Sequence, residues 1–324
     1  MERFAAVLLV AVGAPLVSAA YVAAAELAIR QLPETTQRRV RPWVWVGPAL
    51  VFLTVFLVYP TVNTFVLSLR NANGTQWVGL ANYVFAFTDR EMLIAFRNNM
   101  IWLAFFTGLT VSAGLLIAVL AERVRYESIA KGIVFLPMAL SFVAAGVIWK
   151  FVYEFRPAGT PQIGTLNAVL TGLVPGFQPR AWLVNAPENN FFLVLVGVWM
   201  WTGFCAVILS AALKGVPTEV LEAGRVDGAG EVRLFWQITL PMIASTVAVV
   251  ATTMVITSLK VFDVVYVMTN GNFGTEVIAN RMYKELFNIR HFGRASAIAI
   301  VLFLAILPVM VANIRRFREQ EATR

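Results

Sequence analysis

The sequence contains very little of the chemistry on which catalysis and metal binding usually depend. Its 324 residues include one cysteine, Cys205, and one histidine, His291. A lone cysteine excludes an internal disulfide, and one histidine without a cluster of further ligands does not indicate a metal site. No Gly-x-x-x-x-Gly-Lys-Ser/Thr loop occurs, so the chain does not cradle nucleotide phosphates by that route. We therefore expect neither a metal nor a catalytic residue, and we disfavour an enzyme that acts alone.

Charge is also scarce, whereas apolar residues are abundant. Charged residues make up 14% of the chain and hydrophobic residues 59%, against about 25% and about 45–50% in soluble domains. This surplus exceeds the needs of one soluble core and predicts a surface that faces lipid. The net charge of +8 could suggest nucleic acid, but the basic residues cluster in short segments between apolar runs, as in membrane proteins. The predicted partner is a lipid membrane, not nucleic acid.

Seven apolar runs are candidates for membrane-spanning helices. A helix needs about 20 apolar residues to cross the hydrocarbon layer, and the runs lack the alternation of barrel strands. The sixth run is expected to continue past Lys260 and Asp263 to about Met268. The charge-free runs are Phe4–Ala25, Trp43–Leu69, Asn98–Ala121, Gly132–Trp149, Asn189–Leu213, Met242–Leu259 and Ala295–Ile314. The sequence therefore predicts an all-α polytopic membrane protein.

Basic residues favour one side of the predicted helices. The connections 30–42 and 122–131 and the tail after residue 314 carry arginine and lysine, and the loop 214–241 falls on the same side. Short segments rich in these residues usually lie in the cytoplasm. The opposite segments also carry basic residues, but they are longer and more diluted. This bias predicts an extracytoplasmic N-terminus and a cytoplasmic C-terminus.

The first apolar run has two interpretations. Phe4–Ala20, followed by small residues, could be a cleaved signal peptide. Cleavage would leave the arginines of 38–41 outside and give the second run the wrong orientation, so we interpret the run as a retained helix. Residues 1–42 are accordingly predicted to be an accessory transmembrane helix with a basic linker, and residues 43–324 the main transmembrane domain.

The cytoplasmic loop 214–241 has the signals of a short helix. Pro217 suits the first turn, where a missing N–H does no harm, and Gly228 can end the helix about ten residues later. Ala223 and Gly224 would leave one side nearly bare, so that it could press against the backbone of another protein. The side chains expected to pack back on the bundle are Phe235, Trp236 and Ile238. The alternative is an ordinary amphipathic connector lying on the membrane.

The spacing in this loop resembles the signature of permease subunits in binding-protein-dependent ABC sugar importers. Glu222-Ala223-Gly224 is followed after three residues by Gly228, and after nine more by Ile238-x-Leu240-Pro241. Gly224 departs from the pattern, because alanine is usual at this position. The short helix should still dock to an ATPase, although glycine lowers its helix propensity by roughly 1 kcal/mol. The resemblance assigns coupling to an ATPase to Glu222, Ala223, Gly224, Asp227, Gly228, Ala229, Ile238, Leu240 and Pro241.

The resemblance covers roughly residues 43–324 and implies a type I ABC importer permease, a six-helix core with one extra N-terminal transmembrane helix. The implied partners are a homologous second permease subunit, two ATP-binding ATPase subunits and an extracytoplasmic sugar-binding protein. No cofactor is expected in this chain, because the partner ATPase would bind ATP and magnesium. The segment Val267–Phe287 looks most like the alpha-glucoside permeases. The implied function is to form half of a pathway for di- or oligosaccharides.

Residues of the fifth and sixth runs are candidates for the sugar pathway. The positions that match the sugar contacts of maltose-type permeases are Met200, Trp201, Phe204, Met254, Thr257, Ser258 and Val261. Several are less polar than the family pattern, so either this subunit contributes mainly stacking or the homologous partner holds the sugar. Lys260 and Asp263 are three residues apart, and on one helix they would be neighbours able to form an ion pair.

Two other functions are compatible with an all-α membrane protein of this composition. A non-transporting membrane assembly or sensor component would give no reason for the spacing from Gly228 to Pro241. A gradient-driven transporter more often has a longer chain with repeated halves, and no internal repeat is evident here. Co-purification with an ATPase would favour the importer over both.

Overall fold

The computed structural model describes residues 2–122 and 124–322, with their side chains except those of residues 2–12, 14, 15, 18 and 316–322. Every regular element in these ranges is helical, and the β contact that occurs is an isolated bridge between Arg70 and Trp77. The predicted all-α architecture is confirmed. The chain divides into two compact units, Met1–Thr64 and Phe65–Arg324. The functional division predicted between residues 42 and 43 stays a prediction.

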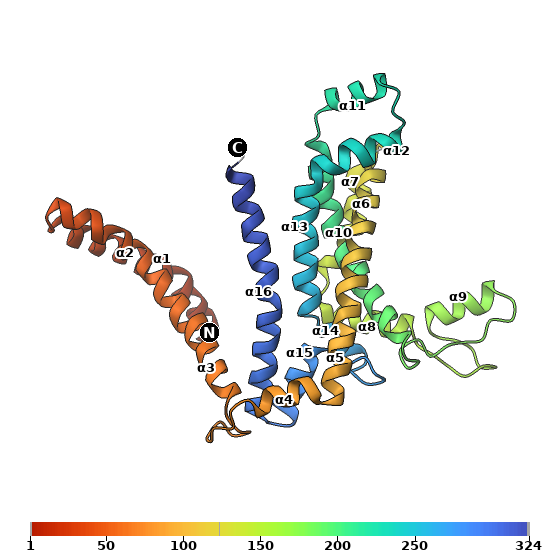
Figure 1. Cartoon of the computed structure of the whole chain (residues 1–324), viewed down its shortest axis with the longest axis horizontal. Helices are drawn as coiled ribbons and strands as arrows, with labels where there is room; N and C mark the ends of the chain where they lie inside the picture. Colours follow the sequence, from red (N-terminus) through yellow and green to blue (C-terminus); the bar gives the residue numbers. More distant parts are fainter. Residues whose placement is uncertain (1, 123, 323–324) are drawn as a thin grey trace. The chain divides into compact units, whose positions relative to one another are not determined.

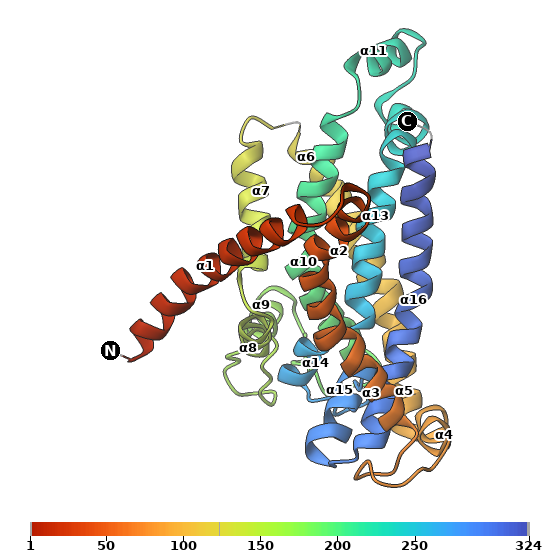
Figure 2. The same ribbon diagram turned by 90° about the vertical axis from the view of Figure 1, so that its left-hand side faces the viewer.

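The first unit contains a pair of helices joined by a short turn (Figure 2). Its elements are α1 (Glu2–Arg30), α2 (Glu34–Leu53), the π-helical turn η1 (Thr54–Val58) and the start of α3 (Tyr59–Ser68). Pro33 precedes α2, and Arg41 of α2 donates to the Glu26 carboxylate of α1 at 2.6 Å. The first predicted run, Phe4–Ala25, is therefore helical, although many of its side chains lie outside the described residues.

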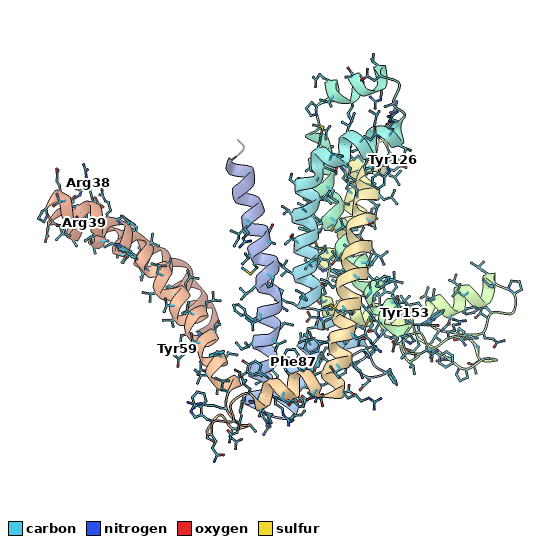
Figure 3. All side chains as sticks on the ribbon, in the orientation of Figure 1. Arg38, Arg39, Tyr59, Phe87, Tyr126 and Tyr153 are labelled. Carbon is cyan, nitrogen blue, oxygen red and sulfur yellow. The ribbon has the colours of Figure 1, made fainter. Side chains whose placement is uncertain are left out.

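The second unit is a bundle of helices (Figure 1), and Figure 3 adds its side chains in the same orientation. Its elements are α4 (Ala81–Thr88), α5 (Arg90–Ile101), η2 (Trp102–Phe106), α6 (Thr107–Ala121), α7 (Glu127–Phe135), η3 (Leu136–Ala139), α8 (Phe142–Val152), α9 (Thr165–Leu173), α10 (Asn189–Lys214), α11 (Thr218–Val226), α12 (Glu231–Leu234), η4 (Phe235–Thr239), α13 (Leu240–Leu259), α14 (Asp263–Met268), α15 (Ile278–Tyr283), η5 (Lys284–Asn288) and α16 (Phe292–Ala322). α6, α10 and α13 pack side by side, with α11 near one end of the bundle and α4, α14 and α15 near the other.

Most of the predicted spans are confirmed. Helical stretches long and apolar enough to cross a membrane, within the described residues, are Glu34–Ser68, Arg90–Ala121, Asn189–Lys214, Glu231–Leu259 and Phe292–Arg315. The fourth run, predicted as one helix, is instead a pair of helical pieces, 127–139 and 142–152, bent by 100°. Pro137 sits in the 3-10 turn that ends the first piece. Ser141 caps the second, its hydroxyl oxygen accepting from the N–H of Ala144 at 3.1 Å.

The sixth run is also interrupted, contrary to prediction. α13 ends at Leu259 and α14 begins only at Asp263, so no single helix continues to Met268. Phe262 has φ −144° and ψ −63°, outside the helical region. The side-chain amide of Asn99 donates to the Leu259 carbonyl at 3.2 Å. It thereby satisfies a group that a further helical turn would have bonded.

The core of the second unit is centred on α10, the most deeply buried of these spans. Glycines let its neighbours approach closely. A Cβ atom on Gly114 of α6 would overlap Cys205 of α10, and one on Gly203 of α10 would overlap the backbone of Val134. Small residues at helix contacts are typical of membrane bundles, where close packing holds the helices together. α10 is therefore a firmly packed element that runs along the unit.

Candidate functional site

The loop 214–241 lies at one end of the second unit and contains the predicted short helix, α11 (Figure 1). Pro217 is its N-cap rather than part of its first turn, and Asp227 is its C-cap. Gly228 follows with φ +82°, a left-handed conformation that favours glycine. The N–H of Gly228 donates to the carbonyl of Arg225 at 3.0 Å. The helix and its glycine stop are therefore as predicted.

The small residues of α11 do not form one outward side. Gly224 is buried against the next segment, where an added Cβ would lie 2.5 Å from Leu234 and 3.0 Å from Ile238. Glu222 and Ala223 are exposed. The bare side predicted from Ala223 and Gly224 is thus corrected, because side chains of the loop itself fill the space beside Gly224. Glu222 and Ala223 belong to the part of α11 open to a partner, which includes every residue of the helix except Leu221 and Gly224.

The second segment of the loop packs on the bundle only in part. Phe235 and Ile238 are half-buried, whereas Trp236 is 63% exposed, contrary to prediction. Trp236 points outward because Leu234, Phe235 and Ile238 occupy the inner side of this turn. Of the other candidate coupling residues, Ala229 and Leu240 are half-buried, and Asp227 and Pro241 are exposed.

Two ion pairs help to orient the loop 214–241. Arg225 of α11 pairs with Glu231 of α12 at 3.0 Å, which joins the two segments of the loop. Lys214, at the end of α10, pairs with Glu127 of α7 at 2.6 Å. Exposed pairs contribute about 0–1 kcal/mol each, so they orient the loop more than they stabilise the unit.

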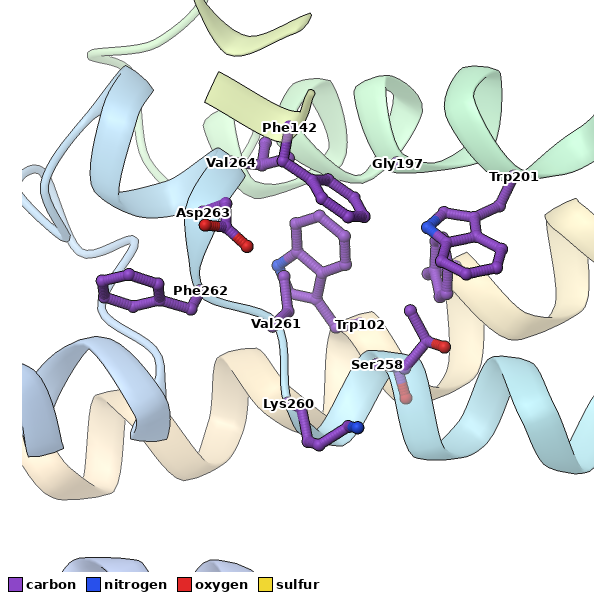
Figure 4. A pocket seen from close by; sticks show the side chains of 12 residues that line it. Trp102, Phe142, Gly197, Trp201, Ser258, Lys260, Val261, Phe262, Asp263 and Val264 are labelled. Carbon is purple, nitrogen blue, oxygen red and sulfur yellow. The ribbon is translucent and has the colours of Figure 1, made fainter. Parts of the chain in front are cut away.

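A pocket of about 380 Å³ lies beside the break between α13 and α14 (Figure 4). Its walls are mostly aromatic, and the ring centroids of Phe142 and Trp201 are 6.3 Å apart. The residues that line it are Trp102, Phe106, Phe142, Gly197, Trp201, Thr257, Ser258, Lys260, Val261, Phe262, Asp263 and Val264. An apolar cavity with a few convergent polar groups is the usual form of a small-molecule site.

The structure brings together four of the seven predicted pathway residues. Those in the pocket lining are Trp201, Thr257, Ser258 and Val261. Phe204 lies just outside, with its ring 5.6 Å from that of Trp201 and nearly perpendicular to it. Met200 and Met254 are only 2% and 0% exposed, and both belong to the core. Neighbours in sequence point about 100° apart around a helix, which explains why residues 200 and 201 differ.

The two hydroxyl groups of the pocket already donate within their own helix. Thr257 donates to the Thr253 carbonyl at 2.9 Å, and Ser258 to the Val255 carbonyl at 2.8 Å. A hydroxyl oxygen that donates in this way keeps lone pairs with which it can accept. Thr257 is half-buried, so it can receive a hydrogen bond from a ligand hydroxyl without losing its own bond to the helix, whereas Ser258 is fully buried and its hydroxyl is enclosed.

The two charges beside the break do not form the predicted ion pair. Lys260 and Asp263 both line the pocket, but no salt bridge joins them. Figure 4 shows the two side chains apart, with Val261 between them. The prediction assumed one continuous helix, and the interruption of that helix removes the spacing on which the pairing depended.

Sequence reasoning missed the other aromatic residues of the pocket. They are Trp102, Phe106, Phe142 and Phe262, from η2, α8 and the segment before α14. Hydropathy does not distinguish an aromatic side chain that faces lipid from one that faces a cavity, so no signal in the sequence would have separated them.

At the opposite end of the unit from α11, a buried carboxylate organises the loop 270–277. Glu276 is 1% exposed and accepts from Lys284 Nζ at 2.7 Å and from Asn280 Nδ2 at 2.5 Å. Gly271, at φ +73°, turns the backbone close to this carboxylate, where any Cβ would overlap it. The loop is therefore wrapped around an ion pair with additional hydrogen bonds.

Replacing Glu276 with glutamine is expected to destabilise the purified protein by about 3 kcal/mol, because Lys284 loses the partner of a largely buried ion pair. Thermal unfolding in detergent or lipid discs checks this. Glu91 is a fitting control, because it is only half-buried and has no ion pair in the part of the chain that the structure describes. Equal midpoints for Glu276→Gln and Glu91→Gln would contradict the stabilising role of the pair.

Comparison with known proteins gives a family match over most of the second unit. Residues 110–319 match the model of the family described as binding-protein-dependent transport system inner membrane component. This range contains the whole loop 214–241 and the pocket residues from Phe142 onward. Trp102 and Phe106 precede it.

Two curated relatives and one solved structure cover most of the chain. The osmoprotective compounds uptake permease protein GgtC of Synechocystis sp. is 60% identical over 281 residues, 87% of this chain and 100% of the relative. The alpha-glucoside transport system permease protein AglF of Rhizobium meliloti is 46% identical over 277 residues, 85% of this chain and 82% of the relative. A chain of a bacterial ABC transporter involved in the import of the acidic polysaccharide alginate superposes with a TM-score of 0.73 and 21% identity, covering 88% of this chain and 99% of that one. At this identity the structural likeness concerns the fold alone.

Proposed function

The chain belongs to the family of binding-protein-dependent transport system inner membrane components, and from that premise we propose that it forms half of the pathway of an ATP-driven importer of di- or oligosaccharides, in particular alpha-glucosides. As a permease component it is not itself an enzyme. The observation that carries the choice of substrate is the aromatic pocket with the accessible hydroxyl of Thr257. Aromatic faces suit the apolar faces of sugar rings, and hydroxyls suit their edges.

A second class of substrate has support of its own. The relative with 60% identity is named for the uptake of osmoprotective compounds, and such solutes need not be sugars. The pocket also contains Lys260 and Asp263, unpaired with each other, and charges of both signs could bind a zwitterion. Uptake should therefore be measured with both classes of substrate.

The proposed partners follow from the family. A homologous permease would complete the pathway, two ATPase subunits would bind ATP and magnesium, and an extracytoplasmic sugar-binding protein would deliver the cargo. No cofactor is proposed for this chain itself. The N-terminus would lie outside and the C-terminus in the cytoplasm, with α11 facing the ATPases. The exposed face with Glu222 and Ala223 supports the last assignment.

In the proposed coupling, α10 and α13 connect the loop 214–241 to the pocket. Both helices flank the loop 214–241, and both contribute to the pocket, α10 through Trp201 and α13 through Thr257 and Ser258. Trp201 and Lys214 are 13 positions apart on one helix, which corresponds to about 20 Å at 1.5 Å per residue. Closure of the ATPases on α11 would move the ends of these helices and thereby reshape the pocket.

The experiment is co-purification of the tagged full-length chain, followed by uptake into proteoliposomes that contain the complex. An ATPase partner and ATP-dependent uptake of a labelled alpha-glucoside support the proposal. Uptake of a zwitterionic osmoprotectant in place of the glucoside would favour the second substrate class. Purification without any ATPase would contradict the importer and favour a non-transporting assembly or sensor component.

A further inference from the structure

Two adjacent asparagines at the end of α5 contact different parts of the molecule, although both are fully buried. The Asn98 amide donates to the carbonyls of Gly274 at 2.8 Å and Glu276 at 2.7 Å. These contacts lie wholly within the external loop 270–277. The Asn99 amide donates to the Leu259 carbonyl at 3.2 Å, and its oxygen accepts from the N–H of Ile278 at 2.9 Å.

Asn99 therefore joins two helix ends. Leu259 is the last residue of α13, and Ile278 is the first of α15. Terminal carbonyls and N–H groups of helices lack intrahelical partners, and one side chain satisfies one group of each kind. Leu259 lies between Ser258 and Lys260, which both line the pocket. Ile278 directly follows the external loop. The pocket wall and the loop thus share one buried amide.

Hydrogen bonds hold the external loop 270–277 in one conformation. Asn189 of α10 donates to the Phe273 carbonyl at 2.9 Å, and the hydroxyls of Thr269 and Thr275 are hydrogen-bonded at 2.7 Å. The Glu276 carboxylate holds the base of the loop, as described above. Phe273 itself is 53% exposed with φ +59°, an unfavourable conformation that persists only where the surroundings impose it. The loop is therefore a rigid unit whose last residue directly precedes Ile278, the residue that donates to Asn99.

We propose that Asn99 is a positioning residue that couples the external loop 270–277 to the pocket wall 258–263, so that contact with the sugar-binding protein at the loop adjusts the pocket for its cargo. This inference rests on the proposed importer function. Asn98 holds the same loop but has no hydrogen bond to the pocket wall among the described residues. The two asparagines have equal burial and adjacent positions, so Asn98 provides the matched control.

The test compares Asn99→Leu with Asn98→Leu in the complete transporter, reconstituted in lipid with its ATPases and binding protein. Leucine has the same number and branching of side-chain heavy atoms as asparagine, and it removes the hydrogen bonds. For Asn99→Leu we expect maximal stimulation of ATP hydrolysis by the sugar-loaded binding protein to fall about fivefold or more, a typical size for coupling between sites. The ratio of uptake rates for two alpha-glucosides should change as well. For Asn98→Leu we expect a higher half-saturating concentration of binding protein, with normal maximal stimulation and an unchanged ratio.

Asn99→Asp provides a second variant if leucine prevents assembly. Its carboxylate oxygen can still accept from Ile278, but it donates to Leu259 only when protonated. Stimulation should therefore recover as the pH falls, and Asn98→Asp should show no such recovery of maximal stimulation. Identical behaviour of the residue 98 and residue 99 variants, or unchanged stimulation in Asn99→Leu, would overturn the coupling role. A wild-type complex without stimulation or uptake would instead overturn the proposed function on which the inference rests.

Discussion

Replacing Gly228 with proline is expected to abolish uptake while the chain still inserts into the membrane. Gly228 has φ +82°, and proline imposes about −65°, so the left-handed turn after α11 cannot form. The substitution also removes the N–H that donates to Arg225 at 3.0 Å. Without this turn, α11 would not end at Asp227, and its orientation relative to α12 would change. Because the proposed motor contact is α11, ATPase closure would no longer be passed to α10 and α13.

Gly230→Pro is the matched control, since Gly230 already has φ −73° and proline fits there. Uptake and ATP hydrolysis are measured on the same reconstituted complexes. We expect at least a tenfold loss of uptake in Gly228→Pro, equivalent to about 1.4 kcal/mol or more in the coupling step, and nearly normal uptake in Gly230→Pro. Full uptake in Gly228→Pro would contradict the coupling role of the loop.

A charge reversal on the exposed face tests the same contact without altering the backbone. Glu222 is exposed on α11, and Glu222→Lys is expected to weaken docking to a basic group of the ATPase. Uptake should fall and part of the ATP hydrolysis should become independent of sugar. Glu219→Lys, one turn earlier on the same helix and also exposed, shows whether position or net charge matters. An equal response to both substitutions would indicate a general charge effect.

The spans were predictable because length and hydropathy decide whether a helix can cross lipid. Their interruptions were not, because each depends on a contact with a distant residue or on a local cap. α13 ends where the Asn99 side-chain amide donates a hydrogen bond to the Leu259 carbonyl, and the two residues are 160 positions apart in sequence. The bend after α7 follows Pro137, which the sequence shows, but it also depends on Ser141, whose capping role becomes visible only once the helix is known to break there. Hydropathy reports neither feature.

The candidate site shows the same limit at the level of single residues. The helix α11 and the stop at Gly228 follow from local signals, so they were correctly predicted. The burial of Gly224 depends on Leu234 and Ile238, whose side chains contact it only after the loop has folded back. Likewise, Trp201 and Met200 are neighbours in sequence, yet one lines the pocket and the other is in the core.

Removing the indole of Trp201 is expected to reduce transport of the cognate glycoside more than any other change in the pocket. The ring is half-buried on α10, with Phe142 at 6.3 Å and Phe204 at 5.6 Å between centroids. It is thus held in place by its neighbours while one side faces the pocket. Trp201→Ala would delete this stacking surface and open space that water can fill. Trp201→Phe keeps a ring, so it should retain part of the activity.

Trp199→Ala is the matched control, because Trp199 lies on the same helix but contacts Trp149 at 5.6 Å and is absent from the pocket lining. Initial rates of uptake at several sugar concentrations separate the two effects. For Trp201→Ala we expect uptake at low sugar concentration to fall about tenfold, corresponding to about 1.4 kcal/mol, whereas Trp199→Ala should lower mainly the amount of assembled complex. Equal losses per assembled complex in both variants would place the sugar elsewhere, and the homologous permease would then be the subunit that holds it.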